Sequence, residues 1–172
     1  MIDDWPSEIV VAVIVRQHVA AIDDLYEYPL PEVAATEEQL ATAERTTGPL
    51  DPGYRRFLTY ADGWRKFLQD IDLFGVDQLQ GAPPMQSVEN GIAAVGDLTD
   101  VMGFELADLQ PIGGSEEQTD MWLLGRPGTP RAGRVLWFWG SDGEDYESFD
   151  EFFLAMIDYN RLRLQRLTGQ VK

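Results

Sequence analysis

Residues 36–63 read TEEQLATAERTTGPLDPGYRRFLTYADG, a stretch that predicts two short capped helices and the turn after them. Thr36 is a suitable N-cap, because its hydroxyl can accept a hydrogen bond from the amide of Gln39, whose side chain can bond back to the Thr36 amide. Gly48 can adopt the left-handed conformation that ends a helix. The first helix is therefore expected to lie between Thr36 and Gly48.

The second half of this stretch predicts another helix. Asp51 can cap it, and Pro52 occupies the first helical position, where a missing N–H costs nothing. The Asp62-Gly63 pair favours a turn and ends the segment. An apolar stripe at helical spacing is formed by Tyr54, Phe57, Leu58 and Ala61. Each of these roles is structural, so the stretch predicts a scaffold and no chemistry.

The composition indicates one globular domain. A chain of 172 residues with 44% hydrophobic residues is long enough to bury a single core. The sequence has no cysteine, which excludes disulfides, thiolate nucleophiles and cysteine-ligated zinc. Its one histidine, His18, has no evident partner for a catalytic triad. We therefore expect neither a cofactor nor a metal site.

The charge of the chain is strongly negative. Its 30 acidic and 13 basic residues give a formal net charge of −17, which argues against nucleic acid and anionic membranes as partners. A basic protein is the natural complement, although abundant acids can also serve solubility or adaptation to salt. No apolar run reaches the roughly 20 residues of a membrane span, and the acidic start lacks the basic region of a secretory signal. A cytoplasmic protein is expected.

The N-terminal part, residues 1–30, predicts an extra helix packed on a domain that covers residues 31–172. Apolar residues recur at three- and four-residue steps from Ser7 to Tyr26, and either Asp4 or Ser7 can cap the helix. The face expected to point inward carries Val11, Ile14, His18, Ile22 and Leu25. His18 is therefore expected to be a hydrogen-bonded core residue.

The second half of the chain predicts a sheet. Strands are expected at Ile71–Val76, Leu109–Ile112, Thr119–Leu124 and Arg134–Trp139. Both faces of the last strand are apolar, so it is expected to be central. The segment just after Gly63 is expected to be irregular, Gly113-Gly114 to form a turn, and residues 142–147 to form an acidic loop. Shorter elements are expected at Val88–Val95 and Val101–Leu106.

The chain ends in a second expected capping box, in which Ser148 is the N-cap and Glu151 the reciprocal partner. The helix that follows has an apolar stripe of Phe149, Phe152, Phe153, Met156 and Leu164. Short spacing between the strands favours antiparallel neighbours. The sequence thus predicts a single α+β domain: a mainly antiparallel twisted sheet of about four to six strands with helices packed around it.

The spacing of these features resembles a known family. In the opening stretch the resemblance is carried by Leu40, Glu44, Gly48, Leu50, Tyr54, Phe57, Leu58 and the Asp62-Gly63 turn. Later segments follow in the order typical of the family: LQPIGG, TDMWLLG, GRVLWFW and a Ser-Phe-x-x-Phe helix start at Ser148. Residues 31–159 in this way resemble the SUKH superfamily, which contains fungal regulators of cell-wall synthesis and bacterial immunity proteins. The resemblance implies a non-enzymatic protein that binds and neutralises a cognate toxin.

Catalytic motifs are incomplete in this sequence. A serine nucleophile would need an available histidine as its base. The EF-hand spacing that starts at Asp142 fails, because Tyr146 stands at the fifth position and Glu147 where glycine is required. A pair of carboxylates in a cleft remains open, since the fold sets their separation.

The residues expected to contact a partner lie near the ends of elements. Trp64 and Trp139 stand beside polar segments, where a tryptophan can anchor a partner, whereas Trp137 is expected in the core. The acidic segment after Trp139 adds Asp142, Glu144, Asp145 and Glu147 to the candidate surface. The alternative is a solvated turn whose acids favour the N-terminus of the next helix.

Three functions are compatible with these observations. The first is an immunity protein that binds and neutralises a toxin, most simply a basic nuclease whose nucleic-acid groove an acidic surface can occupy. The second is a regulatory or scaffold module that binds a protein other than a toxin. The third is a small enzyme that acts through carboxylates. The sequence makes no prediction of the oligomeric state.

Overall fold

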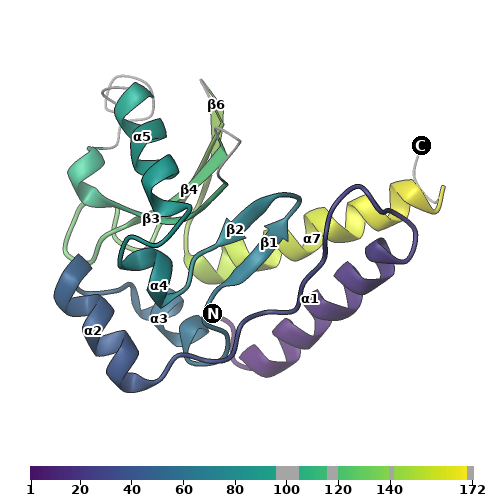
Figure 1. Cartoon of the computed structure of the whole chain (residues 1–172), viewed down its shortest axis with the longest axis horizontal. Helices are drawn as coiled ribbons and strands as arrows, with labels where there is room; N and C mark the ends of the chain where they lie inside the picture. The colour runs from purple at the N-terminus through teal and green to yellow at the C-terminus, as the bar shows by residue number, and fades with distance from the viewer. Residues whose placement is uncertain (96–104, 116–119, 140–141, 170–172) are drawn as a thin grey trace.

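The computed structural model describes residues 1–95, 105–115, 120–139 and 142–169 (Figure 1). Within these ranges the chain forms one α+β domain, in which a six-stranded antiparallel sheet is packed between helices. This confirms the predicted fold class and the mainly antiparallel sheet.

The sheet is a meander in which each strand pairs with the next strand along the chain. Most connections are short, and short connections dictate antiparallel pairing. The one long connection joins the second and third strands, and its described residues include two α-helices and a short 3-10 helix. The strands are β1 (Trp64–Leu68), β2 (Ile71–Leu73), β3 (Leu109–Gly114), β4 (Asp120–Gly125), β5 (Val135–Trp139) and β6 (Asp142–Tyr146).

Helices cover both faces of the sheet (Figure 1). The helices are α1 (Trp5–Ala20), α2 (Glu37–Thr47), α3 (Pro52–Leu58), α4 (Val76–Leu79), α5 (Met85–Val95) and α7 (Phe149–Leu167). On one face Phe152 of α7 packs on Trp122 of β4, with ring centroids 5.1 Å apart, and α1 lies along α7. On the other face Val88 of α5 lies against Gly114 of β3.

The predicted helix starts are confirmed in most details. Thr36 Oγ1 accepts from the Gln39 amide at 3.3 Å, and Gln39 Oε1 accepts from the Thr36 amide at 2.9 Å. Asp51 caps α3, and Ser148 caps α7 by accepting from the Glu151 amide at 3.1 Å. The second capping box differs in one bond, because Glu151 accepts from the amide of Glu147 in place of that of Ser148.

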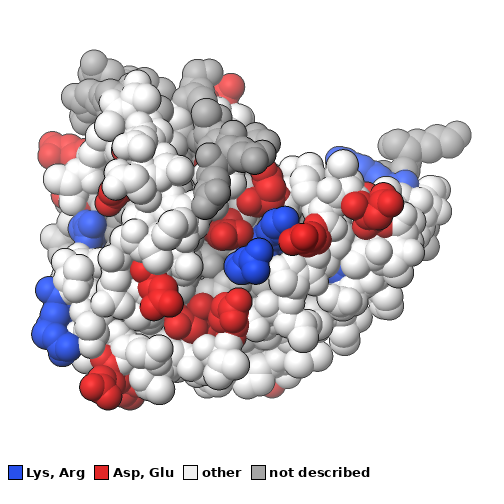
Figure 2. Space-filling model, viewed as in Figure 1, with Lys and Arg blue, Asp and Glu red and all other residues white. Residues whose placement is uncertain are grey.

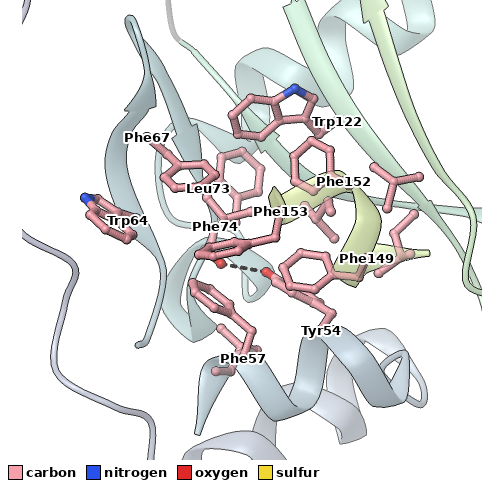
Figure 3. Close-up of a cluster of buried hydrophobic side chains, with 14 of the residues drawn as sticks. Tyr54, Phe57, Trp64, Phe67, Leu73, Phe74, Trp122, Phe149, Phe152 and Phe153 are labelled. Carbon is pink, nitrogen blue, oxygen red and sulfur yellow. Dashed lines mark hydrogen bonds between the residues drawn. The ribbon is translucent and has the colours of Figure 1, made fainter. Parts of the chain in front are cut away.

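The core contains a cluster of large aromatic side chains (Figure 3). Phe153 of α7 lies inside this cluster, with its ring centroid 4.9 Å from that of Trp5 and 5.3 Å from that of Phe67. Tyr54 of α3 donates its buried hydroxyl to the carbonyl of Phe74 at 2.6 Å. Burying rings of this size stabilises the fold by about 2 kcal/mol or more each. Since Trp5 belongs to α1, the N-terminal helix shares the core of the domain.

The N-terminal helix is shorter than predicted and turned about its axis. It ends at Ala20, and its buried residues are Trp5, Ala12, Arg16 and Val19. His18 is exposed, as are Ile14 and Ile22, so the predicted inward face and the predicted core role of His18 are wrong. The segment is apolar on nearly every side, and such a pattern does not specify which side is buried.

Arg16 replaces the histidine as the buried polar residue of α1, with 1% of its surface exposed. Its guanidinium donates to the carbonyl of Lys66 at 2.6 Å and to that of Phe67, where the pairing of β1 with β2 is irregular. It also lies over the rings of Trp64 and Tyr28. Burial lowers the pKa of Arg16 to about 10, so the side chain is charged at neutral pH.

Three further predictions are corrected by the sheet. The segment after Gly63 forms β1, although Lys66 and Gln69 have positive φ values of 50° and 56°. Gly113-Gly114 ends β3, because it pairs with the distant strand β2, and residues 142–146 form the edge strand β6, which pairs with the preceding strand β5. β5 is an interior strand, but it lies next to the edge.

The helix expected at Val88–Val95 is confirmed and starts earlier, at Met85. Most of the element expected at Val101–Leu106 lies outside the described residues, and Leu106 begins a short 3-10 helix, Leu106–Asp108. In the part of the chain that the structure describes, no helix is both long and apolar enough to cross a membrane.

Candidate functional site

The face of the sheet that packs on α7 is covered only in part. Tyr159 of α7 reaches Trp137 of β5, with ring centroids 5.4 Å apart. Trp139, two residues further along the same face of β5, remains partly exposed. The sheet therefore presents an indole ring where the helix cover ends.

The register of the strands places carboxylates around this indole. Trp139 pairs with Asp120 of β4 on one side and with Asp142 of β6 on the other. Trp137 pairs with Glu144 in the same way. Directly opposite residues of an antiparallel pair share a face, so all five side chains lie on one surface. We call Asp120, Trp137, Trp139, Asp142 and Glu144 the β5 tryptophan face.

Two tyrosines hold Glu144 in place. Tyr159 donates its hydroxyl to both carboxylate oxygens, at 2.8 and 2.9 Å, and Tyr146 donates to Oε2. Burial raises the pKa of both tyrosines, and the bonds to the Glu144 carboxylate raise it further. The hydroxyls therefore stay protonated at neutral pH and remain donors.

The surroundings of Asp120 disfavour its charged form. Burial raises its pKa, and the nearby carboxylate of Asp70 raises it further, whereas the neighbouring indole of Trp137 lowers it. Among the described residues, no ion pair involves Asp120, Asp142 or Glu144. The negative charge of the face is thus not neutralised by the described part of the chain.

The other acids predicted for this surface lie elsewhere. Asp145 points to the opposite face of β6 and pairs with Arg134 at 2.8 Å and with Arg131 at 3.9 Å. Glu147 is exposed beyond the end of β6 and donates its amide to Glu151. Because successive side chains of a strand point to opposite faces, Asp145 points away from Asp142 and Glu144.

Trp64 is not available to a partner. It is 1% exposed, and its indole N–H donates to the carbonyl of Pro29 at 2.9 Å. The guanidinium of Arg16 lies 5.2 Å from its ring centroid. Its position in the interior removes Trp64 from the candidate surface.

A groove over β1 and β2 was not expected from the sequence. It consists of two adjoining hollows of about 450 and 310 Å³, which share Arg65, Asp72 and Gln78. Figure 2 shows acidic side chains gathered around a few basic ones on this part of the surface. The acids that line the two hollows are Glu32, Asp62, Asp70, Asp72 and Asp77. Asp70 links the groove to the β5 tryptophan face through its effect on Asp120.

Asp62 has a structural role in this groove. Its carboxylate accepts from the amide of Val76 at 2.7 Å and so caps α4. Burial raises its pKa, the bond from Val76 lowers it, and Asp77 and Glu32 raise it. Gly63, at φ 82°, lies so close to the next turn that an added Cβ would be 2.5 Å from the amide nitrogen of Gly75.

Two carboxylates also meet near the start of α7. Asp51 caps α3, and its pKa is raised by burial, lowered by the amides that it accepts from, and raised by Asp150. Asp150 is 6% exposed and accepts from the amide of Ile2 at 2.6 Å and from Arg56 at 3.2 Å. Both acids thus hold chain segments together. In the described ranges no group of His, Cys, Asp and Glu is arranged to hold a metal ion.

Comparison with known proteins adds no family assignment. The sequence matches no protein-family model, and no curated protein is significantly similar to it. The resemblance to the SUKH superfamily therefore stays a prediction that rests on the spacing of its residues.

Proposed function

We propose that this chain is a non-enzymatic immunity protein of the SUKH type, which binds and neutralises a basic protein toxin, most simply a nuclease. The β5 tryptophan face supports the proposal most strongly, because it combines partly exposed indole with carboxylates that have no described basic partner. The resemblance supplies the functional class. The net charge of −17 favours a positively charged partner.

Neutralisation by such a protein needs no chemistry of its own. An acidic surface speeds the approach of a basic toxin and can occupy the groove in which a nuclease holds its phosphate backbone. A standard interface covers about 800 Å² per partner. The β5 tryptophan face would supply its centre, and the acidic groove over β1 and β2 its continuation. The proposed place of action is the cytoplasm, where the toxin would attack its producer.

Co-expression with toxins encoded beside this gene tests the proposal. We expect restored growth for one adjacent toxin and a complex whose dissociation constant rises with salt, since the attraction between exposed charges is screened. Absence of both rescue and binding for every adjacent candidate would contradict it. Binding of a partner that is not a toxin would instead support a regulatory or scaffold module.

A further inference from the structure

We infer that Trp139 and the carboxylates beside it form a subsite for one arginine side chain of the partner. The inference rests on the proposed function, because it names the group by which the β5 tryptophan face recognises a basic protein. It concerns Trp139, Asp120, Asp142 and Glu144, which the strand register brings to one surface.

The aromatic part of the subsite is open to a cation. Trp137 and Trp139 have ring centroids 5.2 Å apart with planes at 73°, and Tyr159 meets Trp137 at 80°. Within the described residues, Trp137 is the only ring that contacts Trp139, whereas Trp122 contacts three. An indole face attracts a guanidinium more strongly than the other aromatic rings do. The partly exposed ring of Trp139 is thus the natural seat of the cation.

The carboxylates favour arginine over lysine. Asp120 and Asp142 flank Trp139 on neighbouring strands, and opposite side chains in a sheet begin about 5 Å apart. A planar guanidinium can stack on the indole and donate sideways to carboxylates at the same time. An ammonium group is compact and strongly hydrated, so it gains less from this geometry.

The chain itself contains an arrangement of the same kind. Arg163 lies over the ring of Tyr26, with 4.9 Å to the centroid, and donates to the carboxylate of Asp23. One guanidinium there contacts an aromatic face and a carboxylate together. The β5 tryptophan face likewise combines an aromatic ring with carboxylates. Among the described residues, no basic side chain forms an ion pair with these carboxylates.

The subsite can be tested without the toxin. The probes are Nα-acetyl-arginine methylamide and its lysine and citrulline counterparts, titrated into the ¹⁵N-labelled full chain. The readout is the set of five tryptophan indole N–H signals in two-dimensional NMR spectra, with the Trp139 signal assigned by Trp139→Phe. We expect saturable shifts of the Trp139 signal, tightest for arginine, weaker for lysine and negligible for citrulline, which has the shape of arginine without its charge.

Variants connect the shifts to the carboxylates. Asp142→Asn is expected to weaken arginine binding about threefold, as removing one exposed charge does. Glu38→Gln removes an exposed acid on α2 and should leave the titration unchanged. Equal shifts with citrulline, equal shifts of all five signals, or no effect of Asp142→Asn would overturn the inference.

The outcome separates the inference from the proposed function. A toxin neutralised by a chain that ignores the arginine probe would retain the function and remove the subsite. Arginine binding at Trp139 without neutralisation of any adjacent toxin would retain the subsite and remove the function.

Discussion

Replacing Arg16 by methionine is expected to destabilise the domain by about 3 kcal/mol. The guanidinium donates to the carbonyls of Lys66 and Phe67 inside the protein, and methionine has no donor. Each buried carbonyl left without a donor costs about 1 to 3 kcal/mol, and the lost contact with the ring of Trp64 costs about 1 kcal/mol more. Relief from burying a charged group offsets part of this loss. Methionine retains an unbranched apolar stem, so little packing is lost.

Urea denaturation followed by tryptophan fluorescence measures this change. For a chain of this size the loss corresponds to a fall in melting temperature of about 6 to 12 °C. The matched control is Arg45→Met, which changes an exposed helical arginine that donates to the hydroxyl of Thr42. Such a surface change is expected to stay within about 0.5 kcal/mol. Equal stability of the two variants would refute the role assigned to Arg16.

Three further predictions concern a turn, an acid and a tyrosine. Gly63→Ala should lower the free energy of unfolding by more than about 3 kcal/mol, because the new Cβ meets the backbone of the next turn. Gly81 also has a positive φ but lies in open space, so Gly81→Ala should lower it by about 1 kcal/mol in the same urea assay. Acidification from neutral pH towards the ordinary aspartate pKa of 3.8 should favour folding through Asp120, since its raised pKa means that the folded state binds more protons in this interval. Asp120→Asn should reduce that rise in the free energy of unfolding, and an unchanged pH profile would contradict the assignment. Tyr159→Phe should cost about 1 kcal/mol and weaken toxin binding, because it removes a donor from Glu144; unaltered stability and affinity would argue against this role.

The parts of the fold that follow from neighbouring residues are predictable from the sequence. The capping side chains of Thr36, Asp51 and Ser148 act within three residues of their own position, and all three helix starts were predicted. The orientation of α1 was not predictable in this way, because its apolar residues surround the helix and tertiary packing selects the buried side. The buried guanidinium of Arg16, in particular, bonds to the carbonyl of Lys66, which is 50 residues away in the sequence.

The candidate site was predictable only in part for the same reason. Trp139, Asp142 and Glu144 were proposed from their position in the chain, and strand pairing does bring them to one face. Asp120 was missed because it joins them only through the register of β4 with β5. Its place at the start of an expected strand, two residues before Trp122 and hence on the same face, was the available signal.

Growth rescue by charge-reversed variants determines whether the β5 tryptophan face neutralises the toxin. Asp120→Lys/Asp142→Lys changes the β5 tryptophan face, and Glu38→Lys/Glu89→Lys makes the same change in net charge at exposed sites on α2 and α5. Both proteins would first be shown to be folded by their urea unfolding transitions. Growth in the presence of the adjacent toxin is predicted to be lost with the first variant and retained with the second. Equal rescue by the two folded variants would contradict the claim that this face neutralises the toxin.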